Sequence, residues 1–198
     1  QKINMESGYF VETDGILTNK LGITDAEELV STEYRITDEK IGQVLANYHP
    51  LEFNIACLLD IHRQLFDTIY PFAGKIRTVN ISKPDSSVPF CYADFILPEA
   101  NRIFSELAKD QYLRKLPIED FSAKLAYYAA ELNALHPFRE GNGRTTRLFL
   151  VLLARNAGYL LDYAQASRNE ILRADREAFA GNMTPIQNLY HKIVFKID

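Results

Sequence analysis

The sequence predicts an all-α fold, a bundle of helices interrupted by one small β-hairpin. Apolar residues recur at helical spacing through most of the chain, which is typical of amphipathic helices. Residues 77–92 differ, because β-branched residues there flank a Pro-Asp-Ser turn. A helical bundle with a single hairpin is therefore expected.

The individual helices follow from this periodicity and from signals at their ends. Thr24 and Glu27 form a capping-box pattern, so the first helix is expected from about Asp25. Gly158 is expected to end a helix that begins at Arg144. This helix is apolar almost all round, which predicts that it is the buried centre of the fold. Further helices are expected at residues 51–70, 97–110, 117–135, 167–180 and 185–195.

The expected hairpin has an open edge, because Pro89 cannot donate a backbone hydrogen bond to a neighbouring strand. From these residues alone, a surface hairpin without a function of its own is the favoured interpretation.

Composition narrows the class of protein. A chain of 198 residues that is 47% hydrophobic and carries a net charge of −4 is expected to form one domain. It has no basic stripe for a nucleic-acid partner and no apolar stretch long enough for a membrane segment. Cys57 and Cys91 lack the spacing of a zinc site, which favours reduced thiols in a cytosol-like compartment.

One motif dominates the sequence: His-Pro-Phe-Arg-Glu-Gly-Asn-Gly-Arg at 136–144, with a second arginine at 147. Pro137 disfavours helical geometry at the preceding residue, so the chain must turn after His136. The Gly-Asn-Gly segment tolerates unusual dihedral angles, and its successive N–H groups can form a concave nest for an anion. The motif therefore predicts an anion-binding loop between two helices.

The charged residues of the motif indicate what that anion is. Arg144 and Arg147 share the first turn of a helix, where cations are unfavourable unless a negative group neutralises them. A phosphate chain is the simplest such group, and Glu140 beside it predicts a bridging Mg²⁺. The imidazole of His136 can accept a hydroxyl proton near neutral pH. Together these groups indicate nucleotidyl or phosphoryl transfer.

In an alternative interpretation, the motif has no binding role and only forms the turn that ends one core helix and begins the next. It is disfavoured because two arginines and a glutamate beside them would have no structural use. The other histidines, His49, His62 and His191, are interpreted as structural or solvated, since none has acidic or glycine neighbours at a useful spacing.

The motif resembles that of the Fic family, His-Pro-Phe-x-(Asp or Glu)-Gly-Asn-Gly-Arg-x-x-Arg, at every specified position. The resemblance extends from about Leu17 to the C-terminus, which implies a Fic domain at 17–198 behind an N-terminal arm at 1–16. It implies a Fic-type helical bundle with a β-hairpin flap beside the active-site loop. The implied activity is transfer of AMP from ATP to a Ser, Thr or Tyr hydroxyl of a target protein, with release of pyrophosphate.

The same resemblance implies a role for each motif residue. His136 is expected to be the general base and Glu140 the Mg²⁺ ligand. The other expected contributors to nucleotide binding are Phe138 as core anchor, Arg139, the phosphate cradle of Gly141, Asn142 and Gly143, and Arg144 and Arg147 at the β and γ phosphates. The flap, about Thr78 to Tyr92, is expected to hold the target by strand pairing. Lys83 at its turn is a further candidate for phosphate contact, although a solvated turn lysine is the favoured interpretation.

Two alternatives stay open at this point. The Doc-like branch of the superfamily phosphorylates its targets with the nucleotide reversed, but it carries lysine where this chain has Gly143. The second alternative is a non-catalytic module that binds a nucleotide or a partner.

Regulation is inferred from an absent motif. Many Fic enzymes carry an inhibitory helix with Ser or Thr, three arbitrary residues, Glu, and then Gly or Asn. The nearest approach here, from Thr24 to Glu28, is followed by Leu29. The resemblance therefore implies the antitoxin-regulated type, in which a small antitoxin-like protein supplies a glutamate to Arg147. Such an enzyme is expected in the bacterial cytoplasm, or in the host cytosol if it is secreted as an effector.

Overall fold

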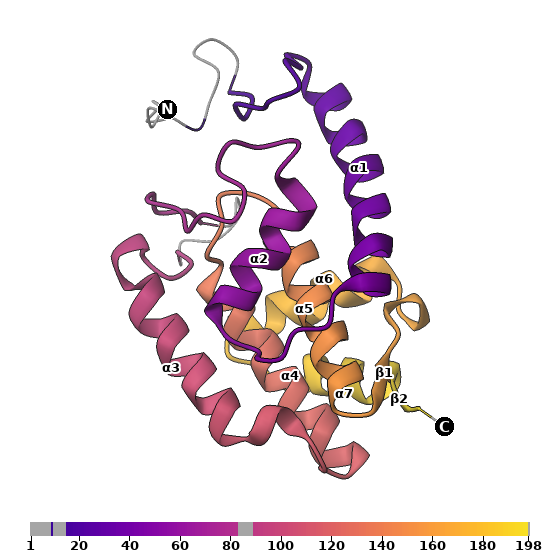
Figure 1. Cartoon of the computed structure of the whole chain (residues 1–198). Coiled ribbons are helices and arrows are strands. Elements are labelled where there is room, and N and C mark those ends of the chain that lie inside the picture. The colour runs from indigo at the N-terminus through magenta and orange to yellow at the C-terminus, as the bar shows by residue number, and fades with distance from the viewer. Residues whose placement is uncertain (1–8, 10–14, 83–88, 198) are drawn as a thin grey trace.

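The fold is that of a mostly helical bundle, as the sequence predicts. A computed structural model describes residues 9, 15–82 and 89–197. Over these residues the α-helices are α1 (Ala26–Asn47), α2 (Ile55–Phe66), α3 (Ile96–Lys109), α4 (Ile118–Leu135), α5 (Asn142–Asn156), α6 (Arg168–Phe179) and α7 (Thr184–Ile193) (Figure 1). In this view α1 and α3 flank a centre that contains α2, α4 and α5.

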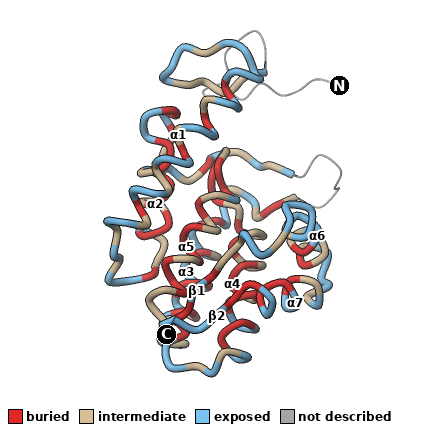
Figure 2. Tube along the Cα trace, turned by 90° about the vertical axis from the view of Figure 1, so that its right-hand side faces the viewer, coloured by how far each residue is buried: buried red, intermediate tan, exposed pale blue. Residues whose placement is uncertain are grey.

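The core forms around α4 and α5, which pack against each other and lie on either side of the motif loop. Phe121 and Leu125 of α4 and Phe149 and Leu153 of α5 have no exposed surface. Figure 2 shows buried stretches, in red, along both helices. Around them, α2 packs on α5, while α6 and α7 pack on α4. The prediction that the helix after the motif is the buried centre is thus confirmed.

Local signals set most helix ends, with two corrections. The cap of α1 is Asp25 rather than Thr24, because the Asp25 carboxylate accepts a 2.8 Å hydrogen bond from the Glu28 N–H. The helix expected at 51–70 is shorter, because the Asn54 side chain caps α2 and the helix ends at Phe66. Ser167 and Glu170 form a full capping box at the start of α6.

Two short strands were not predicted. Strand β1 (Tyr159–Leu161) pairs antiparallel with β2 (Val194–Lys196), which follows α7 directly, whereas helix was expected there up to residue 195. Three-residue strands are too short to show an alternating pattern.

The predicted flap is described only at its base. An antiparallel bridge joins Ser82 to Pro89, and the Phe90 N–H donates to the Ile81 carbonyl over 3.1 Å. Lys83 and the turn lie outside the described residues. The base therefore agrees with the expected hairpin, with Pro89 in the bridge, and the open edge stays a prediction.

In the N-terminal part, Tyr9 packs its ring on Phe72, with centroids 5.5 Å apart, and its carbonyl accepts from the Thr18 N–H. The boundary between arm and domain stays a prediction. No helix in the described part of the chain combines the length and apolarity needed to cross a bilayer.

Candidate active site

The motif loop connects α4 to α5 through two left-handed residues. His136 caps α4 with φ 45° and ψ 60°, and Gly141 precedes α5 with φ 80°. A Cβ atom at Gly141 would lie 2.4 Å from the Phe66 ring. Glycine is therefore required at 141 both by its backbone angle and by the close approach of α2.

The other two residues of the expected cradle have different roles. The Asn142 side chain accepts from the Phe138 N–H and donates to the Phe138 carbonyl, each over 2.8 Å. It therefore holds the loop closed, and only its backbone N–H remains for an anion. Gly143 lies inside α5 without a positive φ, which corrects the expectation of unusual dihedral angles there.

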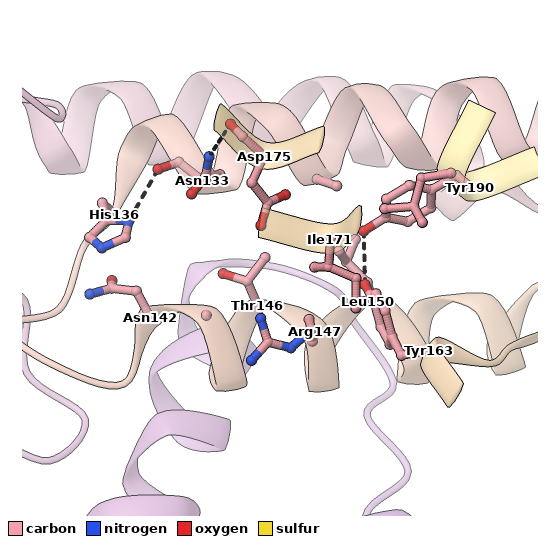
Figure 3. Close-up of a pocket in the computed structure, with 13 residues that line it drawn as sticks. Asn133, His136, Asn142, Thr146, Arg147, Leu150, Tyr163, Ile171, Asp175 and Tyr190 are labelled. Atoms are coloured by element: carbon pink, nitrogen blue, oxygen red, sulfur yellow. Dashed lines mark hydrogen bonds between the residues drawn. The ribbon is translucent and has the colours of Figure 1, made fainter. Parts of the chain in front are cut away.

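His136 is half-buried, and two contacts fix its ring. Its Nδ1 lies 3.2 Å from the Asn133 carbonyl oxygen (Figure 3). The Phe90 ring stacks on it with centroids 3.7 Å apart. A carbonyl can only accept, so in this geometry Nδ1 carries the proton of the neutral ring. Nε2 is then the nitrogen with the lone pair.

A small cavity of about 30 Å³ begins at His136 and runs between α4, α5 and α6 (Figure 3). His136 and Asn142 lie at one end, and the mutually hydrogen-bonded hydroxyls of Tyr163 and Tyr190 lie at the other. Arg147 and Asp175 also line it. This volume holds about one water molecule, so the cavity itself is too small for a nucleotide.

Burial raises the pKa of both Tyr163 and Tyr190 above the usual value for tyrosine. Their hydroxyls therefore stay protonated at neutral pH and close the inner end of the cavity as neutral groups.

Arg147 of α5 lies beside the backbone of Gly143, where a Cβ atom would be 3.1 Å from one guanidinium nitrogen. It forms no ion pair with any residue that the structure describes. Its charge is thus available near the start of α5, at the cavity that His136 also lines.

Arg144 faces the opposite way, toward α1. Its guanidinium pairs with the Glu33 carboxylate and donates to the Thr37 hydroxyl over 3.1 Å. It also lies over the rings of Tyr34 and Phe66, 4.9 and 5.0 Å from their centroids. The premise that both motif arginines lack a structural use is therefore wrong for Arg144, because Glu33 neutralises it. A phosphate contact by Arg144 stays a prediction.

Glu140 has a side chain that is 44% exposed and lies 3.8 Å from the Arg144 guanidinium. One of its oxygens accepts from the Gly141 N–H over 2.8 Å. Mg²⁺ commonly binds through one or two carboxylates together with phosphate oxygens, and a single accessible carboxylate beside an anion-binding loop fits that set. No group of three or more His, Cys, Asp or Glu side chains suited to a metal occurs among residues 9, 15–82 and 89–197.

Phe138 is buried as expected, and it stacks on His62 with centroids 3.8 Å apart. His62 has no exposed surface; its Nδ1 accepts from the Gly74 N–H, and its Nε2 lies 3.0 Å from the Glu140 carbonyl. Burial lowers its pKa to about 4, so it is neutral at physiological pH. The structural interpretation of His62 fits this geometry, but its role under the motif loop was not predicted, because 78 residues separate it from Glu140.

Arg139 is half-buried in the loop. Arg77 was not predicted to be a site residue at all, although its guanidinium donates to the His136 carbonyl over 2.8 Å. An arginine within an expected strand was the only signal for it.

The chain is similar in sequence to a known family and to individual known proteins. Residues 52–154 match the description of the Fic/DOC family. The chain is 40% identical over 168 residues to the protein adenylyltransferase VbhT of Bartonella schoenbuchensis, which covers 85% of this chain and 35% of that protein. It is 36% identical to the probable protein adenylyltransferase y4lH of Sinorhizobium fredii, which covers 86% of this chain and 87% of that protein. The chain thus spans about a third of the first relative and most of the second.

Two solved structures share the fold. A Fic domain of a VirB-translocated Bep effector from Bartonella quintana, with bound ADP, has a TM-score of 0.94 at 28% identity, covering 97% of this chain and 96% of that one. BepC from Bartonella tribocorum, with bound AMPPNP, has a TM-score of 0.94 at 25% identity, covering 98% of this chain and 100% of that one. The expected Fic-type fold is confirmed, and the chain belongs to the Fic/DOC family.

Proposed function

We propose that this chain transfers AMP from ATP to a hydroxyl side chain of a protein and releases pyrophosphate. One observation carries the proposal: His136, with its Nδ1 held by the Asn133 carbonyl, lies across a cavity mouth from Arg147 at the start of α5. The adenylyltransferase names of the relatives and the nucleotides bound in the two Bep structures support the same reaction.

The base is Nε2 of His136. Because Nδ1–H donates to a fixed carbonyl and Phe90 holds the ring plane, Nε2 can take the proton of an incoming Ser, Thr or Tyr hydroxyl. The hydroxyl oxygen then attacks the α phosphorus of ATP, and pyrophosphate leaves on the opposite side.

The triphosphate is held by the start of α5. As is also the case for α3, α4 and α7, no side chain among the described residues caps the N-terminus of α5. Its first N–H groups can therefore donate to phosphate oxygens, and the helix dipole favours their charge. Arg147 adds a guanidinium for the terminal phosphates, and Arg144, released from Glu33, is the second candidate.

Glu140 would hold Mg²⁺ together with phosphate oxygens, and that ion supplies charge neutralisation for the leaving pyrophosphate. Two contacts fix the position of Glu140. His62 Nε2 contacts its backbone carbonyl, and the Gly141 N–H donates to one of its carboxylate oxygens. Arg139 is proposed to contribute to nucleotide binding from the same loop.

The target segment docks on the flap, about Thr78 to Tyr92. Pro89 leaves its edge open, and Phe90 connects the flap base to His136. Behind Phe90, a groove of about 550 Å³ between the flap base, α3, α4 and α6 offers room for such a segment. Lys83, at the flap turn, stays a candidate for phosphate contact.

Inhibition is proposed to come from a separate antitoxin-like protein that supplies a glutamate to Arg147. Helix α1 already brings a glutamate to the motif, but Glu33 pairs with Arg144 and leaves Arg147 without an ion pair to described residues. We expect the isolated chain to be active. Low activity that no partner changes would contradict this part of the proposal.

The free thiols of Cys57 and Cys91 favour a reducing compartment, which we propose to be the bacterial cytoplasm or, after secretion, the host cytosol.

Labelled ATP distinguishes the proposal from both alternatives. In a bacterial lysate, label from the α phosphate should appear on protein with the native chain and not with His136→Ala. Label from the γ phosphate would instead indicate Doc-like phosphorylation, which the glycine at 143 disfavours. An unchanged biological effect of His136→Ala would indicate a non-catalytic module.

A further inference from the structure

Arg77 has an unusual environment for a charged side chain. It is only 2% exposed, and its guanidinium donates to three backbone carbonyls. The acceptors are the His136 carbonyl at 2.8 Å, the Val79 carbonyl at 2.6 Å, and the Cys91 carbonyl. Its own backbone N–H donates to the Pro137 carbonyl at 2.9 Å.

No acidic side chain of the described residues forms an ion pair with Arg77. Burial lowers the pKa of its guanidinium relative to that of a solvated arginine. A buried cation without a carboxylate is unfavourable unless its hydrogen bonds are satisfied, and backbone carbonyls are the groups that satisfy them here. The charge of such an arginine contributes little to the stability of the fold. Its main effect is to fix the positions of the backbone segments that accept its hydrogen bonds.

The three acceptors belong to the three segments that must be aligned for transfer. Val79 lies on the first side of the flap and Cys91 on the second, and His136 is the base. The Cys91 N–H also donates to the Ala134 carbonyl of α4 over 3.0 Å, and Phe90 stacks on His136. The Arg77 side chain is thus the group that contacts both sides of the flap base and the catalytic loop at once, beside these two pairwise contacts.

We propose that Arg77 is a positioning residue that sets the distance between the flap, which aligns the target hydroxyl, and Nε2 of His136. This inference rests on the proposed function. The three nitrogens of the planar guanidinium each donate to a different carbonyl, whereas lysine carries its donors on a single nitrogen and lacks this fixed fork geometry. Arg77→Lys would therefore retain the charge and lose the alignment.

The chain offers a matched control. Arg155 also donates to backbone carbonyls, those of Leu45 at 2.7 Å and Tyr48 at 2.8 Å, but it does so at the far end of α5. Arg155→Lys therefore removes the same kind of interaction at a place remote from the flap.

The experiment compares the native chain with Arg77→Lys, Arg77→Gln and Arg155→Lys. Affinity for AMPPNP is measured by calorimetry, and AMP transfer to lysate proteins is followed with α-labelled ATP. Amide hydrogen exchange at Phe90 and Cys91 is measured by NMR. Thermal unfolding identifies any variant that does not fold, and Arg77→Lys is the milder of the two changes at 77.

For Arg77→Lys we expect AMPPNP affinity within about threefold of native and a loss of transfer of about 100-fold, as a small misplacement of reacting groups produces. Amide exchange at Phe90 and Cys91 should become about tenfold faster. Arg155→Lys should change neither AMP transfer nor the exchange at these two amides. Native transfer by Arg77→Lys, native exchange at the flap base, or a parallel loss of AMPPNP binding would each overturn the inference.

A failure of the proposed function has a different signature. If the native chain labels no protein, AMP transfer is contradicted, whereas the exchange rates and the AMPPNP affinities still report whether Arg77 aligns the flap base.

Discussion

The motif loop has two faces, and each carries an imidazole stacked on a phenylalanine. On the core face, His62 stacks on Phe138 with an interplanar angle of 7°, and on the open face, His136 stacks on Phe90 at 10°. The surroundings differ sharply. His62 has no exposed surface and uses both nitrogens on backbone groups, whereas His136 is half-buried at the mouth of a cavity.

The difference shows that surroundings, rather than residue type, decide which histidine can act as a base. A ring nitrogen that already contacts a backbone group cannot accept a substrate proton. Core-face residues should therefore govern stability, and open-face residues should govern transfer. The following substitutions test that division, from the largest expected effect to the smallest.

On the open face, His136→Ala should lower AMP transfer by about 1000-fold, because a positioned general base contributes on this order. Stability should change by less than about 1 kcal/mol, since the ring is only half-buried. Transfer is measured with α-labelled ATP and stability by urea unfolding. A stability loss as large as those of the core-face variants would abolish the distinction between the faces.

On the core face, Glu33→Gln should destabilise the fold by about 3 kcal/mol, because it leaves Arg144, whose side chain is only 13% exposed, without its main carboxylate. Asp67→Asn is the matched control, since Asp67, directly after α2, also pairs with a cation, Lys40 of α1, but its side chain is 49% exposed. Its cost should stay below about 1 kcal/mol. Equal midpoints in urea for both variants would show that the Glu33 pair has no special role.

Gly141→Ala should cost about 2 to 3 kcal/mol, because φ is 80° there and a Cβ atom would overlap Phe66. Gly143→Ala should be neutral or slightly stabilising, since Gly143 is helical. The same Gly143 variant should weaken AMPPNP binding, because its methyl group would crowd Arg147. Urea unfolding and calorimetry check the pair, and a reversed order of stability would contradict the assigned geometry.

The pKa of His62 predicts a pH dependence. In the folded chain its pKa is lowered to about 4 from 6.5, so the unfolded chain binds the extra proton between these values. The stability that neutral His62 provides is therefore complete above about pH 6.5 and is lost as the pH falls toward 4. From pH 7 to 5 the loss should be about 2 kcal/mol. Urea unfolding of the native chain and of His62→Gln should show a steeper pH slope in the native chain, and parallel slopes would contradict it.

The sequence predicted best what depends on local signals. The bounds of α3, α4 and α6 lie within one or two residues of expectation, since apolar spacing and caps such as Ser167 determine them. The β1–β2 pair was missed because its strands are three residues long and lie far apart in the chain.

The long-range contacts of the site could not be predicted either, because the contacting residues lie far apart in the sequence. His62, Arg77 and Glu33 reach the motif from segments 59 to 111 residues away, and no spacing rule relates such positions. The roles expected for His136, Glu140 and Arg147 arise within one loop and one helix turn, where spacing does constrain geometry. Arg144 lies in the same helix turn, but it pairs with Glu33 of α1, and the spacing of the motif gave no signal for that pair.

The central claim is that His136 directs transfer of AMP rather than phosphate. Its most direct test is the intact mass of a target protein isolated after incubation with ATP, Mg²⁺ and the native chain, with His136→Ala as control. We expect an added mass of one AMP group with the native chain and no addition with the variant. An added mass of a single phosphate, or an AMP adduct that persists in His136→Ala, would contradict it.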